Sequence, residues 1–209
     1  MEPAAVVFTS RIEPEEQARA DFYALLARLY AAEPDAALLR SIAGADELEI
    51  EEGNAEGETL AEAWRMLIAA SAVFDVEAAA AEYLELFVGV GASAVSPHAS
   101  AYEKVPGRQP LVEVRAALAR LSLSRQPGNV LYEDHLAAIF ATMRALITGV
   151  GAVAFSIDEQ RAFFTAHVDS WVVSCCDAIN RCSIANYYQR VAQLTKAFVA
   201  VERDSFAIG

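Results

Sequence analysis

The chain has 209 residues, 55% of them hydrophobic, and carries 29 Asp and Glu residues against 16 Lys and Arg. This length and apolar content suffice for one sizeable hydrophobic core. The formal net charge of -13 argues against a nucleic-acid partner, because neutralising phosphate groups requires clustered cations and none cluster here. Such a charge attracts a cationic partner instead.

Cysteine usage and the apolar segments bound the location of the protein. The three cysteines, Cys175, Cys176 and Cys182, lie in one segment and do not form the framework of a disulfide-rich domain. The N-terminal stretch "MEPAAVVFTSRIEPEE" lacks the basic and apolar regions of a secretory signal. The longest apolar windows contain Glu82 and Glu85 or fall short of the roughly 20 residues that a membrane span needs. We expect a soluble cytoplasmic protein without membrane insertion.

Helical periodicity dominates the whole chain, and sustained period-two alternation is hard to find. The pattern predicts an all-α single domain over residues 1–209, a bundle of roughly eight to ten helices. The first helix opens near Pro14, and Asp35 can cap a short second helix. The acidic, glycine-punctuated stretch at about 44–58 predicts a solvated loop, which is followed by a helix from about 59 to 73.

The middle of the chain contains one long irregular connection. A helix predicted from 76 to 87 leads into a crossing loop at about 88–110, which is longer than connections in compact domains usually are. Such a loop is either mobile or functional. Helices follow at about 111–121, after the motif "YEDH", and from about 158 to 182, and the last begins near Tyr187.

The stretch "NVLYEDHLAAIFATMRALI" places Glu133, Asp134 and His135 directly before an apolar helix face. A catalytic cluster is disfavoured, because successive helical residues point in different directions and the chain offers no recognisable nucleophile setting. As a helix start, the two acids lie near the positive end of the dipole and one of them can cap the helix. This interpretation explains the acids and leaves the histidine unexplained.

Metal and nucleotide sites are poorly supported. A ferritin-like dinuclear site needs an acid three residues before each histidine ligand, and His98, His135 and His167 have none there. The cysteine spacing is not that of a zinc site, and the two "GVGA" segments lack the remainder of a phosphate-binding loop. We expect no catalytic residue, no metal and no cofactor.

Two segments together resemble the TorD-like family of cytoplasmic chaperones for molybdenum enzymes, which includes the DmsD and NarJ types. These are "EYLELFVGVGASAVSPHASAYEK" and, about thirty residues later, "YEDHLAAIFATMRAL". Members typically show a helix that ends in a Leu-Phe-Val-Gly-like element, then a loop with Pro, Ser and an aromatic residue, then an acid-Pro-x-Asp-His motif that opens a helix. The matching residues, which the resemblance implies bind peptide, are Tyr83, Leu86, Phe87, Pro97, Ser100, Tyr102, Glu133, Asp134 and His135.

The likeness extends over nearly the whole chain, with two departures. The segment "FFTAHVDSWV" is similar to the family's His-x3-Trp helix and adds His167 and Trp171 as secondary candidates. His98 stands where an aromatic residue is more usual and is a third secondary candidate. Leu131 and Tyr132 replace the acid-Pro pair, so the turn into the helix is less constrained. These departures bear on which client the chain serves.

The resemblance implies a chaperone rather than an enzyme. Such a chaperone binds the N-terminal leader, often a twin-arginine signal, of the catalytic subunit of a molybdopterin oxidoreductase, and assists cofactor insertion and assembly before export. A cationic leader with an apolar region needs an acidic surface beside an apolar groove. The alternatives are a generic helical interaction module and a small helical enzyme or metal-binding protein.

The same resemblance suggests how the site works. Tyr83, Leu86 and Phe87, with Tyr102, are expected to line the apolar groove, while Asp134 and neighbouring acids face the arginines of the leader. The ring of His135 is expected to tie the motif to the crossing loop. The chain is expected to be a monomer or a domain-swapped homodimer, for which the 88–110 loop is a candidate hinge.

Overall fold

The computed structural model describes residues 12–49, 54–89, 93–103, 105–125, 128 and 130–208. Over these residues it contains nine α-helices, two short π-helical segments and one 3-10 turn, with two isolated bridges and no longer strand. The predicted all-α class and the predicted number of helices are therefore confirmed. The α-helices are α1 (Pro14–Ala31), α2 (Ala36–Ala43), α3 (Ala55–Val73), α4 (Val76–Tyr83), α5 (Pro110–Arg120), α6 (Leu136–Thr148), α7 (Ile157–Phe164), α8 (Val172–Arg181) and α9 (Tyr187–Ile208).

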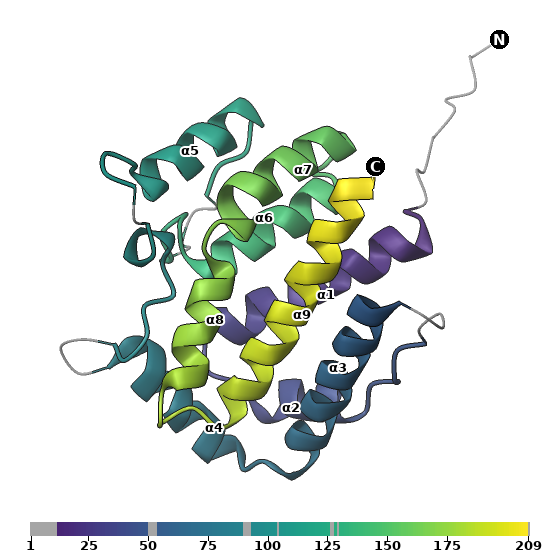
Figure 1. Ribbon diagram of the computed structural model, residues 1–209, viewed down its shortest axis with the longest axis vertical. Helices are drawn as coiled ribbons and strands as arrows, with labels where there is room; N and C mark the ends of the chain where they lie inside the picture. Colours follow the sequence, from purple (N-terminus) through teal and green to yellow (C-terminus); the bar gives the residue numbers. More distant parts are fainter. Residues whose placement is uncertain are drawn as a thin grey trace.

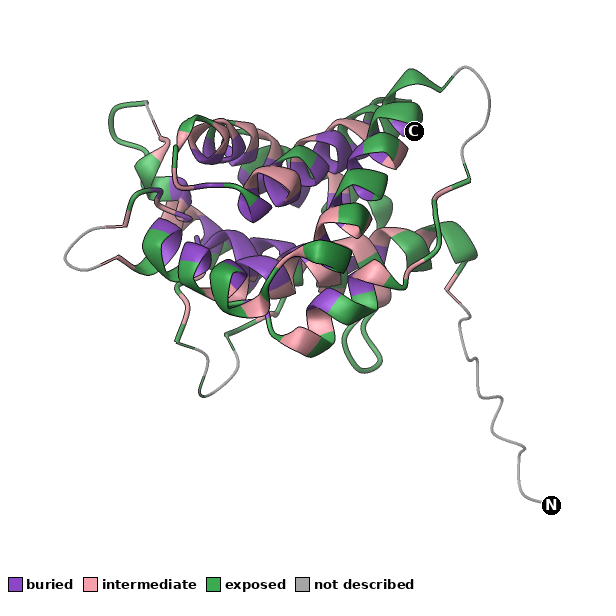
Figure 2. Cartoon of the chain, turned by 90° about the horizontal axis from the view of Figure 1, so that it is seen from below, coloured by how far each residue is buried: buried purple, intermediate pink, exposed green. Residues whose placement is uncertain are grey.

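The core lies between α1, α6 and α9, with α3 and α8 packed against α9 (Figure 1). Buried positions line the inner faces of these helices (Figure 2). Tyr23 and Phe140 carry the contact between α1 and α6, and Phe198 of α9 packs edge-on against Tyr23 with ring centroids 4.8 Å apart. Each large apolar side chain buried in this way stabilises the fold by about 1.5–3 kcal/mol relative to an exposed one.

Local capping explains where the first helices begin. Asp35 accepts a hydrogen bond from the backbone N–H of Leu38 at 2.8 Å and so caps α2, as predicted. Asn54 caps α3 in the same way through Gly57 at 2.9 Å, so residues 55–58 are helical and the acidic loop is shorter than expected. An amide cap and acids in the first turn both favour a helix start at this point.

Two predicted helices are interrupted by π-helical turns. The helix expected from 76 to 87 changes at Tyr83 into a π segment, η1 (Leu84–Val88), which ends at Gly89 with a φ of 61°. The helix expected from 158 to 182 is divided into α7, a π segment η3 (Thr165–Asp169) and α8. The prediction of one continuous helix there was wrong, because the π segment has more residues per turn than an α-helix and the backbone of Trp171, at φ -145° and ψ -22°, is not helical.

One side of the molecule is attached less extensively. Figure 1 shows α5 at the upper left, away from α3 and α9, and its main contact is with the 3-10 turn η2 (Ala99–Ala101). This region carries most of the expected functional loop; residues 90–92 and 104 of that loop, and 50–53 of the acidic loop, lie outside the described residues. Across the described part of the chain, no helix is long and apolar enough to cross a membrane.

Candidate functional site

The crossing loop is fastened to the start of α6 by backbone hydrogen bonds. The N–H of Leu136 donates to the carbonyl of Pro97 at 2.8 Å, and the N–H of Ala99 donates to the carbonyl of Asp134 at 3.0 Å. These bonds form an isolated antiparallel bridge between His98 and His135. The loop and the "YEDH" motif, some thirty residues apart in the sequence, are therefore one structural unit.

Asp134 reinforces this unit with its side chain. The carboxylate is only 3% exposed, and it bonds to the His98 ring at Nδ1 (3.1 Å) and to the Ser100 hydroxyl (2.9 Å). Burial alone raises the pKa of Asp134, but the bonds with His98 and Ser100 outweigh that effect and hold the pKa below its usual value. The expected contact of this carboxylate with a leader's arginines does not fit the geometry, because its oxygens already bind the loop.

His135 has a different task from the one expected. Its Nδ1 accepts a hydrogen bond from the N–H of Ala137 at 3.1 Å, so the histidine, and not an acid, caps α6. Burial lowers the pKa of His135 to about 4, with the nearby His98 acting in the same direction, so the ring is neutral at physiological pH. The ring packs edge-on against His98 with centroids 4.9 Å apart. The hydrogen bonds between this part of the motif and the loop are therefore made by the backbone, and not by the His135 ring as expected.

Glu133 connects the motif to α5. Its carboxylate oxygen Oε2 accepts from Nε of Arg115 at 3.0 Å, and Nη2 of Arg115 lies at the same distance from this oxygen as an ion-pair contact. A guanidinium that approaches one carboxylate through two of its nitrogens restricts the orientation of both groups. The three side chains of the motif therefore contact three different elements. Glu133 pairs with α5, Asp134 bonds to the crossing loop, and His135 caps the first turn of α6.

Tyr102 and Trp171 form the aromatic centre of the site. Their rings are stacked at 5.6 Å with an interplanar angle of 24°. The Tyr102 hydroxyl donates to the carbonyl of Ser96 at 2.8 Å, and the Trp171 indole N–H donates to the carbonyl of His167 at 2.7 Å. The indole bond replaces a backbone bond lost at the break between η3 and α8, so that break is what presents Trp171 to the loop.

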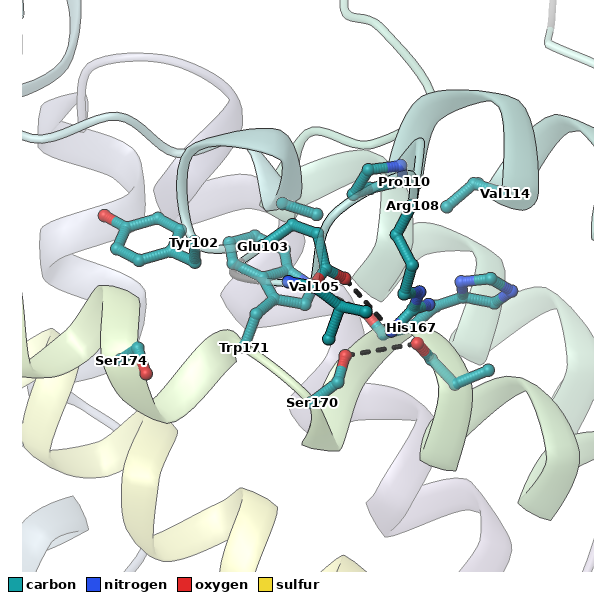
Figure 3. Close-up of a pocket in the computed structure, with 12 residues that line it drawn as sticks. Tyr102, Glu103, Val105, Arg108, Pro110, Val114, His167, Ser170, Trp171 and Ser174 are labelled. Carbon is teal, nitrogen blue, oxygen red and sulfur yellow. Dashed lines mark hydrogen bonds and ion pairs between the residues drawn. The ribbon is translucent and has the colours of Figure 1, made fainter.

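A cavity of about 320 Å³ lies beside this stack, between the crossing loop, α5 and the η3–α8 junction (Figure 3). Its wall combines the two aromatic rings with aliphatic and polar groups. Burial lowers the pKa of His167 to about 4, so this ring is also neutral at physiological pH. The lining residues are Ala99, Tyr102, Glu103, Val105, Arg108, Pro110, Val114, Ala166, His167, Ser170, Trp171 and Ser174.

The other three expected groove residues lie behind the loop, in the core. Leu86 is fully buried, and its carbonyl accepts from the N–H of Val95 at 2.9 Å. The Tyr83 hydroxyl donates to the carbonyl of Tyr30, and Phe87 packs against Tyr30 and Tyr83. In this structure these residues support the loop and do not line an open groove.

Several residues of the cavity were not expected from the sequence. They come mainly from the loop tip and α5: Glu103, Val105, Arg108 and Val114 line the cavity, and Glu113 pairs with Arg108. One signal could have found them, since "VPGRQP" reads as a tight turn that leads directly into a helix. Within the described ranges, no group of three or more His, Cys, Asp or Glu residues is arranged to hold a metal ion.

Comparison with known proteins places the chain in a family. The model of the family described as nitrate reductase delta subunit matches residues 54–177. The chaperone protein TorD of Shewanella loihica is 28% identical over 206 residues, which cover 92% of this chain and 94% of that protein. The chaperone protein TorD of Shewanella pealeana is 27% identical over 212 residues, which cover 94% and 93%.

The family match and the two relatives agree with the resemblance inferred from the motifs. The match covers more than half of the chain, and both relatives are named chaperones, so the expectation of a non-enzymatic protein is confirmed at the level of the family. The chain therefore belongs to the nitrate reductase delta subunit family, the family of TorD-like and NarJ-like chaperones that serve the maturation of redox enzymes.

Proposed function

We propose that the chain binds the N-terminal leader of a molybdopterin-containing oxidoreductase subunit in the cytoplasm. The leader is a twin-arginine signal, and binding holds the subunit until its cofactor is inserted and it is assembled for export. The observation that carries this proposal is the aromatic cavity. It opens beside the stacked rings of Tyr102 and Trp171, on the loop that the "YEDH" motif fastens to α6.

The chemistry of the cavity suits such a ligand. A twin-arginine leader combines a cationic segment with an apolar one, and its receptor needs both an apolar surface and carboxylates. Val105, Val114 and the two aromatic rings supply the first; Glu103 lines the cavity, and Glu113 pairs with the lining residue Arg108. The net charge of -13 favours the approach of a cationic peptide from a distance.

The expected site residues then divide into two groups. Tyr102 and Trp171, with His167 beside them, form the surface that contacts the leader. The remaining residues position that surface from behind, by hydrogen bonds to the loop or by packing under it. These are Tyr83, Leu86, Phe87, Pro97, His98, Ser100, Glu133, Asp134 and His135.

Affinity capture tests the partner directly. The full chain, immobilised and exposed to extracts of cells that naturally contain it, is expected to retain a molybdopterin oxidoreductase subunit that still carries its leader, identified by mass spectrometry. Retention of the subunit only after its leader has been removed would contradict leader binding. Recovery of no oxidoreductase subunit would contradict the chaperone proposal as a whole.

Isothermal titration with the captured leader tests the cavity. Trp171→Ala removes the larger ring of the stack and is expected to weaken binding by about tenfold or more, since buried aromatic anchors dominate such interfaces. The control is Val73→Ala, which removes an exposed apolar side chain at the end of α3, away from the cavity lining. Equal affinities for the two variants would place the leader elsewhere on the molecule.

A further inference from the structure

The side chain of Arg108 lies at the mouth of the cavity between two carboxylates. Its Nη1 is 3.0 Å from Oε2 of Glu103, and its Nε donates to both oxygens of Glu113 at 3.2 and 3.1 Å. Its Nη2 also donates to Glu113. The two acids come from different elements, Glu103 from the crossing loop and Glu113 from the first turn of α5. Figure 3 shows the guanidinium beside Glu103, directed toward His167.

A tight turn places the arginine there. The N–H of Arg108 donates to the carbonyl of Val105 at 3.2 Å, and Pro106 and Gly107 occupy the two central positions, with a φ of 88° at Gly107. Proline followed by a residue with positive φ is the pattern of a type II turn. The chain reverses at this turn, so the Arg108 side chain points back toward Glu103 and forward to α5.

We infer that Glu103 and Glu113 form a binding site for one arginine side chain of the leader, and that Arg108 occupies this site when no leader is bound. The inference deepens the proposed function and rests on it. The site accepts a guanidinium, because one already lies in it within ion-pairing distance of a carboxylate on each side. The cavity behind it, with its aromatic wall, has room for the residues that follow the arginine.

The exposures of the three side chains fit an exchange. Arg108 is 36% exposed, so its side chain can swing into solvent without disturbing the core. The acids are more shielded, at 15% for Glu103 and 34% for Glu113. Replacing one guanidinium by another leaves the charge of the site unchanged, and neither carboxylate loses its partner. A lysine does so less well, since its compact ammonium group does not match two carboxylates as a planar fork does.

Arg65 offers a matched control. It also lies between two carboxylates, those of Glu62 and Glu47, but it is 51% exposed and does not line the cavity. Arg65→Gln and Arg108→Gln therefore remove the same charge from similar ion pairs. Any difference between them reports the position of Arg108 at the cavity.

The test uses three synthetic peptides that differ at one pair of positions, followed by the same leucine- and alanine-rich stretch. The pair is Arg-Arg, Lys-Lys or Gln-Gln, and binding is measured by fluorescence anisotropy at low ionic strength. Arg108→Gln is expected to bind the Arg-Arg peptide about twofold to fivefold more tightly than Arg65→Gln does, the range expected from losing an exposed competing ion pair. Glu103→Gln is expected to weaken binding of the Arg-Arg peptide about tenfold and of the Gln-Gln peptide little.

The outcomes separate this inference from the proposed function. If Arg108→Gln and Arg65→Gln bind the Arg-Arg peptide equally, or if the unmodified chain binds all three peptides equally, the arginine site is refuted while leader binding stands. If the unmodified chain binds none of the peptides and no captured leader, the proposed function itself is refuted. Thermal melts of the variants, expected to match that of the unmodified chain, exclude a folding defect as the cause of weak binding.

Discussion

Acidic side chains anchor both the core around α9 and the region around α5, but in different ways. In the core, Glu202 is almost fully buried and accepts from Arg19 at 2.6 and 2.9 Å and from the Tyr23 hydroxyl at 2.8 Å. Glu82, also buried, accepts from three successive backbone N–H groups at the start of α9 at 2.7–3.0 Å. These donors lie in α1 and α9, except the N–H of Asn186, which directly precedes α9.

Around α5 the acids are paired with arginines at the surface. Glu133 holds Arg115, and Glu103 and Glu113 share Arg108. A buried carboxylate that loses its donors leaves an uncompensated charge in the core, so such pairs cannot exchange partners without a large loss of free energy. Surface pairs contribute little to stability and exchange readily. The same carboxylate–guanidinium chemistry therefore fixes the core on one side of the molecule, and on the other side it leaves pairs that are exposed enough for the exchange that the proposed arginine site requires.

The largest expected effect comes from breaking the core anchor. Glu202→Ala leaves the part-buried guanidinium of Arg19 and the buried Tyr23 hydroxyl without their acceptor. Loss of one partner of a buried pair costs about 3–5 kcal/mol of unfolding free energy. Urea denaturation followed by circular dichroism measures this loss. Asp204→Asn, an exposed acid on the same helix, is the control and is expected to change stability by no more than about 0.5 kcal/mol.

On the side of the molecule near α5, the cap of α6 by His135 is expected to make the unfolding free energy depend on pH. The pKa of His135 is about 4 in the fold, against about 6.5 in the unfolded chain, so protons bind the unfolded state first as the pH falls. The stability from a neutral His135 is present above pH 6.5 and is lost between pH 6.5 and 4, in total by about 3 kcal/mol.

A variant that caps without titrating isolates this contribution. His135→Asn keeps a cap acceptor and is expected to show a flatter decline of unfolding free energy between pH 6.5 and 4. At pH 8, where His135 is unprotonated in both the folded and the unfolded chain, neither protein loses stability to its protonation. Parallel pH profiles for the variant and the unmodified chain would show that His135 is not neutral in the fold.

The fastening of the loop comes next in size. Asp134→Asn removes the charge from the hydrogen bonds to His98 and Ser100 and is expected to cost about 1.5–3 kcal/mol. Because the loop carries Tyr102, leader affinity is expected to fall as well, although Asp134 does not face the cavity. Hydrogen exchange is expected to rise at Ala99 and Ser100 and to stay unchanged in α9. Unchanged exchange at Ala99, whose N–H bonds to the Asp134 carbonyl, would mean that the backbone bridge alone holds the loop.

Local rules account for the parts of this structure that the sequence predicted. Helical periodicity and the cap at Asp35 depend on residues three or four positions apart, and the predicted helices are present, except that the one expected over 158–182 is divided. The docking of the loop depends on His98 and Asp134, which are 36 residues apart, and no local rule relates them. The family resemblance brought these residues together, but it could not show which of them face the cavity.

The smallest expected effect is at the link between the motif and α5. Arg115→Gln removes the ion pair with Glu133, in which Arg115 is about half exposed, so the unfolding free energy is expected to fall by less than about 1 kcal/mol. The local effect is larger than the global one, because α5 makes few other contacts with the bundle. Faster amide exchange throughout α5, with α6 and α9 unchanged, is the expected result. If α5 exchanges at its original rate, packing against the 3-10 turn η2 holds it, and the pair of Glu133 with Arg115 does not.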